Sequence, residues 1–135
     1  MADKPRTLIL TGASRGIGHA TVRRFSEAGW RIITCSRDDV PEACQYDPNW
    51  AYHIPTNLGN TDELAAFIDQ ANNYIGDDGL AALVNNAAVS PKTPYKERLG
   101  CLNGEEIAWR EVFELNFFVP LKLCRGFAAA LHRGK

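Results

Sequence analysis

The sequence predicts an α/β fold, in which a doubly wound parallel sheet carries helices on both faces. Two observations lead to this prediction. A glycine-rich segment, residues 11–18, stands between a short apolar run and an amphipathic stretch. Further along, apolar runs of strand length alternate with stretches of helical periodicity. Strands and helices that alternate in this way pair in parallel through right-handed crossovers, and the predicted strand order is 3-2-1-4.

The pattern begins with residues 8–10, which are all apolar and predict a buried strand. From Ile17 onward the apolar residues fall close to helical spacing, and Gly29 ends the predicted helix. A second strand is predicted over residues 31–36. Residues 38–49 contain two prolines and little periodicity, so any helix there should be short.

A third strand is predicted over residues 50–55, where the pattern alternates. The next helix begins at Asn60, with Glu63 as the second member of a capping box, and ends at Gly76. Residues 80–84 are apolar at successive positions, which predicts a strand covered on both faces.

The last part of the sequence predicts a long loop followed by a single long helix. Residues 89–103 form a loop that is long for a compact domain, and such loops are usually functional, so we expect it to face a substrate or a partner. Residues 105–132 predict one helix, with acidic residues in its first turn and basic residues towards its end. Its many charges exclude a membrane span.

Composition narrows the function classes. The chain has 135 residues, enough for one domain, and 45% of them are hydrophobic, as in ordinary globular proteins. Lys and Arg total 15 and Asp and Glu total 16, so the sequence lacks the basic excess of a nucleic-acid-binding protein. No run is long and apolar enough to span a membrane. The cysteines have no Cys-x-x-Cys spacing, which predicts reduced thiols in the cytoplasm and no metal site: Cys35, Cys44, Cys101 and Cys124.

Three glycines predict a phosphate-binding turn: Gly12, Gly16 and Gly18. A tight turn, close approach of the backbone to a phosphate and close packing of helix on strand each favour a residue without a side chain. The start of the following helix adds unpaired N–H groups and the positive end of its dipole. Residues 18–20 lack the Lys-Ser/Thr of a Walker A loop. The alternative is a glycine-rich turn without a ligand.

The end of the second strand predicts the choice between NADP and NAD. An acidic residue there favours a free ribose hydroxyl, but the sequence has Ser36 and Arg37. Arg37 can make a charge-assisted bond to a 2′-phosphate, with Arg15 as a second donor. Asp38 follows one position too late, so NADP is predicted over NAD. The alternative for Arg37 is a solvated surface charge.

Three motifs in the expected order resemble the short-chain dehydrogenase/reductase family: residues 11–18, residues 85–88 (NNAA) and Asn116. The resemblance covers the whole chain. It implies a Rossmann-type fold, with residues 1–135 forming a single NAD(P)-binding domain that is incomplete at its C-terminus. It also implies an oxidoreductase that moves a hydride between the nicotinamide of its cofactor and a carbonyl or alcohol substrate. Dimers or tetramers, with the long helix at the interface, are implied as well.

Carried over residue by residue, the resemblance implies a cofactor site of backbone and side-chain groups. Two positions depart from the family pattern. Ala88 stands where Gly is usual, and Asn57-Leu58 replaces Asp-Val or Asp-Leu, although the Asn57 carbonyl can still accept a bond from the adenine amino group. The cofactor-binding residues are then Gly12, Ser14, Arg15, Gly16, Ile17, Gly18, Ser36, Arg37, Asn57, Leu58, Asn86, Ala87 and Ala88.

Asn116 is the catalytic candidate, because in this family an asparagine of the corresponding helix completes a proton relay. Its neighbourhood adds a physical reason. Pro120 has no N–H to give to the Asn116 carbonyl, so a kink and a free carbonyl that can hold a water are expected. The alternative is a buried asparagine beside a kink that packing tolerates.

The family's serine and Tyr-x-x-x-Lys pair are missing. The residues four positions after Tyr46, Tyr52, Tyr74 and Tyr95 are Trp50, Thr56, Asp78 and Leu99. We therefore expect the chain to be the N-terminal part of a longer domain and to be inactive alone. The alternatives are a non-catalytic nucleotide-binding or interaction module and, less well matched, a methyltransferase-like fold, which would need an acidic residue after the second strand.

Overall fold

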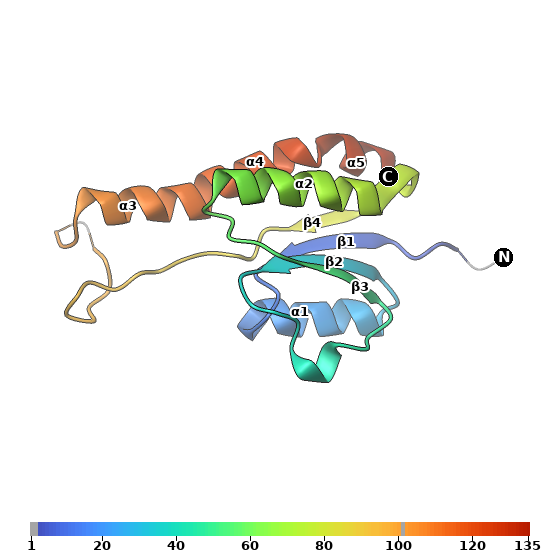
Figure 1. Cartoon of the computed structure of the whole chain (residues 1–135), viewed down its shortest axis with the longest axis horizontal. Coiled ribbons are helices and arrows are strands. Elements are labelled where there is room, and N and C mark those ends of the chain that lie inside the picture. Colours follow the sequence, from blue (N-terminus) through green and yellow to red (C-terminus); the bar gives the residue numbers. More distant parts are fainter. Residues whose placement is uncertain (1–2, 101) are drawn as a thin grey trace.

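A parallel sheet forms the centre of the molecule, and helices cover both of its faces (Figure 1). The computed structural model describes residues 3–100 and 102–135. Its four strands lie in the order β3-β2-β1-β4, and each neighbouring pair is parallel. The predicted fold class and the predicted order 3-2-1-4 are confirmed.

The strands and helices follow the predicted sequence of elements. The strands are β1 Thr7–Thr11, β2 Arg31–Ser36, β3 Trp50–Pro55 and β4 Ala82–Val84. The helices are α1 Gly16–Glu27, α2 Thr61–Ile75, α3 Glu106–Phe113, α4 Val119–Gly126 and α5 Ala128–Arg133, with 3₁₀ turns at Glu42–Cys44 and Gly76–Asp78. β4 is shorter than predicted, because the Leu80 amide donates to the Ala130 carbonyl of α5 (2.8 Å).

Alternation along β1 supplies one core on each face of the sheet. Leu8 and Leu10 pack with Val22 of α1 on one face. Ile9 points the other way, into a larger core with Phe67 of α2 and side chains of α4 and α5. Burial of each of these side chains contributes about 1.5–3 kcal/mol. β4 lies at the edge of the sheet, and its residues are half-buried, so the predicted coverage on both faces is only partial.

The start of α2 confirms one half of the predicted capping box. The Asn60 side chain accepts hydrogen bonds from the Asp62 and Glu63 amides (3.0 and 3.1 Å). The reciprocal bond is absent, because the Glu63 carboxylate instead accepts from the Asn57 amide (2.6 Å). The capping glutamate therefore holds the loop between β3 and α2, which borders the cleft described below.

The prediction of one helix over residues 105–132 is wrong, since the segment is broken twice. Val119 donates its amide to the Glu114 carbonyl, five residues back, and this forms a π-helical turn over Glu114–Phe118, which ends two residues before Pro120. The second break follows Gly126, whose carbonyl accepts a bond from the Asn72 side chain of α2 (3.1 Å).

The predicted loop before α3 contains a small turn of its own. Thr93 and Glu97 are joined by a backbone hydrogen bond (2.9 Å), and Lys92 pairs with Arg98 across the turn. Cys101, one of the predicted free thiols, lies outside the described residues. Cys35, Cys44 and Cys124 are free. Across residues 3–100 and 102–135, no helix has both the length and the apolar character needed to cross a membrane.

Candidate functional site

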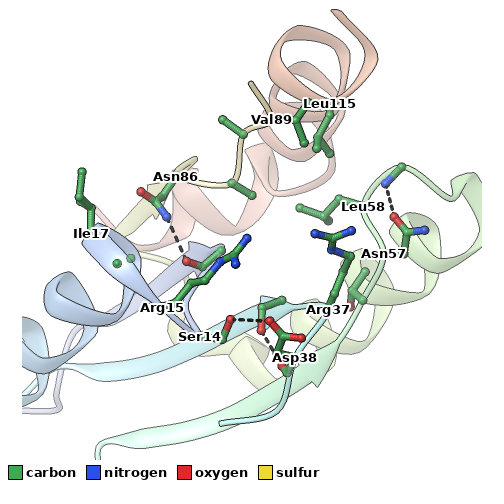
Figure 2. A pocket seen from close by; sticks show the side chains of 18 of the residues that line it. Ser14, Arg15, Ile17, Arg37, Asp38, Asn57, Leu58, Asn86, Val89 and Leu115 are labelled. Carbon is green, nitrogen blue, oxygen red and sulfur yellow. Dashed lines mark hydrogen bonds between the residues drawn. The ribbon is translucent and has the colours of Figure 1, made fainter. Parts of the chain in front are cut away.

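The carboxyl ends of the strands open into a cleft of about 660 Å³ (Figure 2). Such a crevice, outside the carboxyl ends of parallel strands, is where open α/β sheets bind ligands. Every cofactor-binding residue that the sequence predicted lines this cleft, whereas Asn116 does not.

The glycine turn between β1 and α1 forms one wall, and each of its three glycines meets a different requirement. Gly12 has a φ of 70°, and a Cβ atom there would lie 3.0 Å from the Ala87 Cα. Gly18 packs so closely that a Cβ atom would overlap the Gly12 carbonyl oxygen. Gly16 has a φ of 58° and no atom within 4 Å of its ideal Cβ position, so it faces open space. At its glycines the wall is therefore bare backbone.

The N-terminus of α1 belongs to this wall, because the first residues of the helix, Gly16, Ile17 and Gly18, line the cleft. The N-cap residue is Arg15, which makes no side-chain hydrogen bond to the first amides of the helix, and the first turn contains no acidic residue. Unpaired N–H groups and the positive end of a helix dipole together attract an anion. The turn is thus suited to a phosphate group.

Asn86, in the segment after β4, fastens the glycine turn to the sheet. Its side-chain amide donates to the carbonyls of Thr11 and Gly12 (both 3.1 Å). The buried Thr11 hydroxyl accepts from the amides of Asn86 and Ala87 (3.1 and 3.0 Å). Ala88 fits without strain, since Lys96 is the one described non-glycine residue with a positive φ.

The loop after β3 forms a second wall, with Leu58 buried beneath it. The Asn57 side-chain oxygen accepts a bond from the Gly59 amide (3.1 Å). A carbonyl oxygen has two lone pairs, so it keeps the capacity to accept one further bond, as expected from the sequence.

Charged side chains meet between these two walls. Arg15, from the turn before α1, and Arg37, from the turn after β2, both extend towards the middle of the cleft (Figure 2). Asp38 also lines the cleft, contrary to the expectation from the end of the strand, and its carboxylate accepts a bond from the Ser14 hydroxyl (3.5 Å). Ser36 donates its hydroxyl to the Asp38 carbonyl (2.6 Å) and is therefore committed to the turn.

Asn116 acts on the cleft through its neighbour Val89. The Asn116 side chain accepts from the Val89 amide and donates to the Val89 carbonyl, both at 2.8 Å. Val89 lines the cleft, as do Leu115 and Glu111 from the helix face opposite. Glu111 and Leu115 were not predicted from the sequence, although they are one helical turn apart and so share a face.

Two features limit the chemistry of the chain's own groups. Burial raises the pKa of the Cys35 thiol to about 12, although a backbone hydrogen bond involving Gly12 opposes this, so Cys35 is no nucleophile at neutral pH. Within the described parts of the chain, no three His, Cys, Asp or Glu side chains gather to hold a metal ion.

Comparison with known proteins gives a consistent result. The family model for short chain dehydrogenases matches residues 6–135. Protein FixR of Bradyrhizobium diazoefficiens is 44% identical over 91% of the chain and 45% of its own length. A fatty acyl-CoA reductase of Mycobacterium tuberculosis is 30% identical over 96% of the chain and 44% of its own length. The chain thus spans less than half the length of these relatives.

A solved structure agrees in fold as well as sequence. An oxidoreductase of the short-chain dehydrogenase/reductase family from Brucella ovis, in complex with a partially ordered NAD, is 43% identical with a TM-score of 0.83. The match covers 95% of this chain and 58% of that one. Since the family model matches almost the whole chain, and residues of both the glycine turn and the segment after β4 line one cleft, the chain belongs to the short-chain dehydrogenase family.

Proposed function

We propose that the chain is the cofactor-binding part of an NADP(H)-dependent oxidoreductase of the short-chain type. When bound, the nicotinamide supplies or accepts a hydride, and the other reactant is a carbonyl or an alcohol. The observation that carries the proposal is the convergence of Arg15 and Arg37 on a cleft that has the glycine turn as one wall.

The glycine turn fits a pyrophosphate. The first amides of α1 lack a side-chain cap, so they are free to donate to phosphate oxygens. Gly16 leaves the space above it open, and a side chain there would fill it. Asn86 keeps the turn in place from behind, through bonds to two carbonyls.

We call the part of the cleft beside Arg15 and Arg37 the ribose end, because the adenosine ribose of the cofactor would bind there. Its two guanidinium groups favour NADP over NAD. Arg37 and Arg15 provide several N–H donors in the same part of the cleft, and these donors suit a phosphate better than a neutral hydroxyl. Asp38 is the opposing feature, because its carboxylate would repel a phosphate and accept from a hydroxyl. The relative bound to NAD makes this balance the point to test.

The test is a titration of the protein with NADPH and with NADH. Arg37→Ala should weaken NADPH binding about tenfold or more, as expected for a lost charge-assisted bond, and change NADH binding less than twofold. Asp38→Asn should strengthen NADPH binding. Arg24→Ala, which removes an exposed charge of α1 paired with Glu27, is the matched control. Equal losses for both nucleotides in Arg37→Ala would overturn the assignment of NADP.

Asn116 is proposed to serve a proton relay through its carbonyl. Pro120 has no N–H to donate to this main-chain carbonyl. Asn116 also lies within the π-helical turn, where the regular pairing of helical hydrogen bonds is disturbed. The relay's other members are not in the sequence, which has no Tyr-x-x-x-Lys. We therefore propose that this chain by itself oxidises no NADPH with carbonyl substrates. Protein-dependent NADPH oxidation would contradict that proposal.

The proposal extends to assembly and location. Large apolar side chains are exposed along α3, the π-helical turn and α4, which suits a contact between subunits in a dimer or tetramer: Ile107, Phe113, Phe117, Phe118 and Leu121. Three free thiols suit a reducing compartment, and we place the protein in the cytoplasm.

A further inference from the structure

His53, on β3, occupies the centre of a hydrogen-bond network beneath the ribose end of the cleft. Its Nδ1 atom lies 2.7 Å from the Thr34 hydroxyl. Its Nε2 atom lies 2.8 Å from the Asp38 carbonyl and 3.2 Å from the Ser36 hydroxyl. Trp50 reaches the same Thr34 hydroxyl through its indole N–H (2.6 Å). The network is half-buried at His53 and fully buried at Thr34.

The partners of His53 determine which ring nitrogen carries the proton. The Asp38 carbonyl can only accept, so Nε2 must donate to it. The Trp50 indole can only donate, so the Thr34 oxygen accepts that bond and gives its own proton to Nδ1. The neutral imidazole with its proton on Nε2 therefore satisfies every polar group of the network. A phenylalanine ring at this position would leave the buried Thr34 hydroxyl and the Asp38 carbonyl each with one partner fewer.

The group that His53 holds is part of the turn that presents Arg37. The Asp38 carbonyl, one residue after Arg37, accepts from both Ser36 and His53, so both of its lone pairs are used. On the other side of Arg37, the Ser36 carbonyl accepts from the Thr56 amide (2.8 Å). The backbone on both sides of Arg37 is thus tied to the third strand and the residue that follows it. Its side chain extends from this fixed turn into the cleft (Figure 2).

We propose that His53 is a positioning residue that sets the choice between NADPH and NADH, by holding the Asp38 carbonyl and with it the direction in which Arg37 enters the cleft. The inference rests on the proposed role of Arg37 towards a 2′-phosphate. It assigns a ligand-directed task to a side chain that lies outside the cleft lining.

The experiment measures dissociation constants for NADPH and NADH in the wild type, in the single variants His53→Phe, His53→Gln and Arg37→Ala, and in the double variant that combines His53→Phe with Arg37→Ala. His53→Phe keeps a flat ring but removes the hydrogen bonds of both ring nitrogens. It should weaken NADPH binding about tenfold while changing NADH binding less than twofold. His53→Gln keeps an N–H donor near the Nε2 position and should restore NADPH binding to within about threefold of wild type. In the Arg37→Ala background, His53→Phe should cause no further loss, because the two residues act on one contact.

His19→Phe is the matched control. His19 also lies beside the Trp50 ring: the two ring centroids are 6.2 Å apart, compared with 6.1 Å between Trp50 and His53. The Nε2 atom of His19, however, contacts the Cys44 sulfur and not the turn that carries Arg37. The control variant should leave the ratio of the two dissociation constants unchanged. Circular dichroism melting curves of each variant report folding separately.

The outcomes separate the inference from the proposed function. Suppose that Arg37→Ala weakens NADPH binding more than NADH binding. If His53→Phe then weakens the binding of both nucleotides equally, or causes a full further loss of NADPH binding in the Arg37→Ala background, His53 is only structural and the inference is wrong. If the ratio of the dissociation constants for NADPH and NADH is the same in the wild type and in Arg37→Ala, the NADP assignment fails and the inference fails with it. If His53→Phe does not fold, the failure of His53→Gln to keep the wild-type ratio would overturn the inference.

Discussion

Burial decides which cysteines of this protein can react. Cys35 lies in the central strand β2 with no exposed surface, and burial raises the pKa of its thiol to about 12. Cys124 is exposed and Cys44 is half-buried. Among these three thiols, at pH 8 we expect iodoacetamide to modify Cys124 before Cys44, and Cys35 only after the protein is unfolded in urea. Peptide mass mapping over time measures this order. Modification of Cys35 as fast as Cys124 in the folded protein would contradict it.

Single residues also show where sequence reasoning ends. Arg37 could be assigned to the cleft because it directly follows a predicted strand, and side chains at that place face the crevice. Asp38 was excluded on the same argument, yet its carboxylate lies in the cleft because the turn after β2 folds back onto Ser14. The path of a turn depends on contacts with other segments, and the end of a strand does not determine it.

At the scale of elements, Asp47 joins the end of α1 to the turn before β3. Burial would raise the pKa of this carboxyl, but bonds from the Ser26 hydroxyl and from the amides of Asn49 and Trp50 outweigh burial and lower the pKa below its usual value. The folded state therefore favours the charged form. The stability from this group is present above the unfolded-state pKa of about 3.9 and is lost as the pH falls through the lowered folded-state value.

The corresponding prediction compares two variants. Asp47→Asn should lower the free energy of unfolding by about 1 kcal/mol at pH 7, because the Ser26 bond (2.6 Å) and the Asn49 bond are weakened. The difference from wild type should shrink below about pH 4. Urea unfolding at a series of pH values measures it. Asp69→Asn, at an exposed position of α2, is the control, and a gap that stayed constant down to pH 2 would contradict the prediction.

The π-helical turn and the segment after β4 form a second pair of joined elements. Asn116 holds Val89 through two bonds of 2.8 Å. Asn116→Ala should increase the rate of hydrogen exchange at the Val89 amide about fivefold, with a loss of about 1 kcal/mol in local stability. Asn73→Ala, at an exposed position of α2, should leave that rate unchanged. An unchanged rate in Asn116→Ala would show that the Asn116 side chain does not hold Val89 in place.

Elements were predictable where local sequence controls them. β2 and β3 have the predicted bounds, and Asn60 caps α2 as expected, since apolar pattern and capping chemistry act within a few residues. The single long helix was wrong because its two breaks have different origins. Pro120 is a local signal for the first, but the second involves Asn72 on another helix.

At the scale of the whole molecule, one face of α3 and α4 remains apolar and uncovered. Phe113, Phe117 and Leu121 are spaced four residues apart, and their exposed fractions are 57%, 57% and 45%. If this face joins subunits as proposed, Phe117→Glu should convert dimers or tetramers to monomers in sedimentation velocity runs. Tyr46→Glu, at a residue that is 93% exposed beside the first 3₁₀ turn, should leave the assembly unchanged. A monomeric wild type would contradict the proposed assembly.

By itself, the sequence determined the order of strands and helices, the parallel sheet and the glycine turn, because period, apolar runs and glycine spacing are properties of neighbouring residues. It also placed its predicted cofactor-binding residues at the cleft, since parallel strands bring their carboxyl ends to one edge. Only the tertiary structure decided that Glu63 holds Asn57, that Asn116 holds Val89 and that His53 holds the turn of Arg37. These bonds join different segments, and their geometry exists only once the elements have packed.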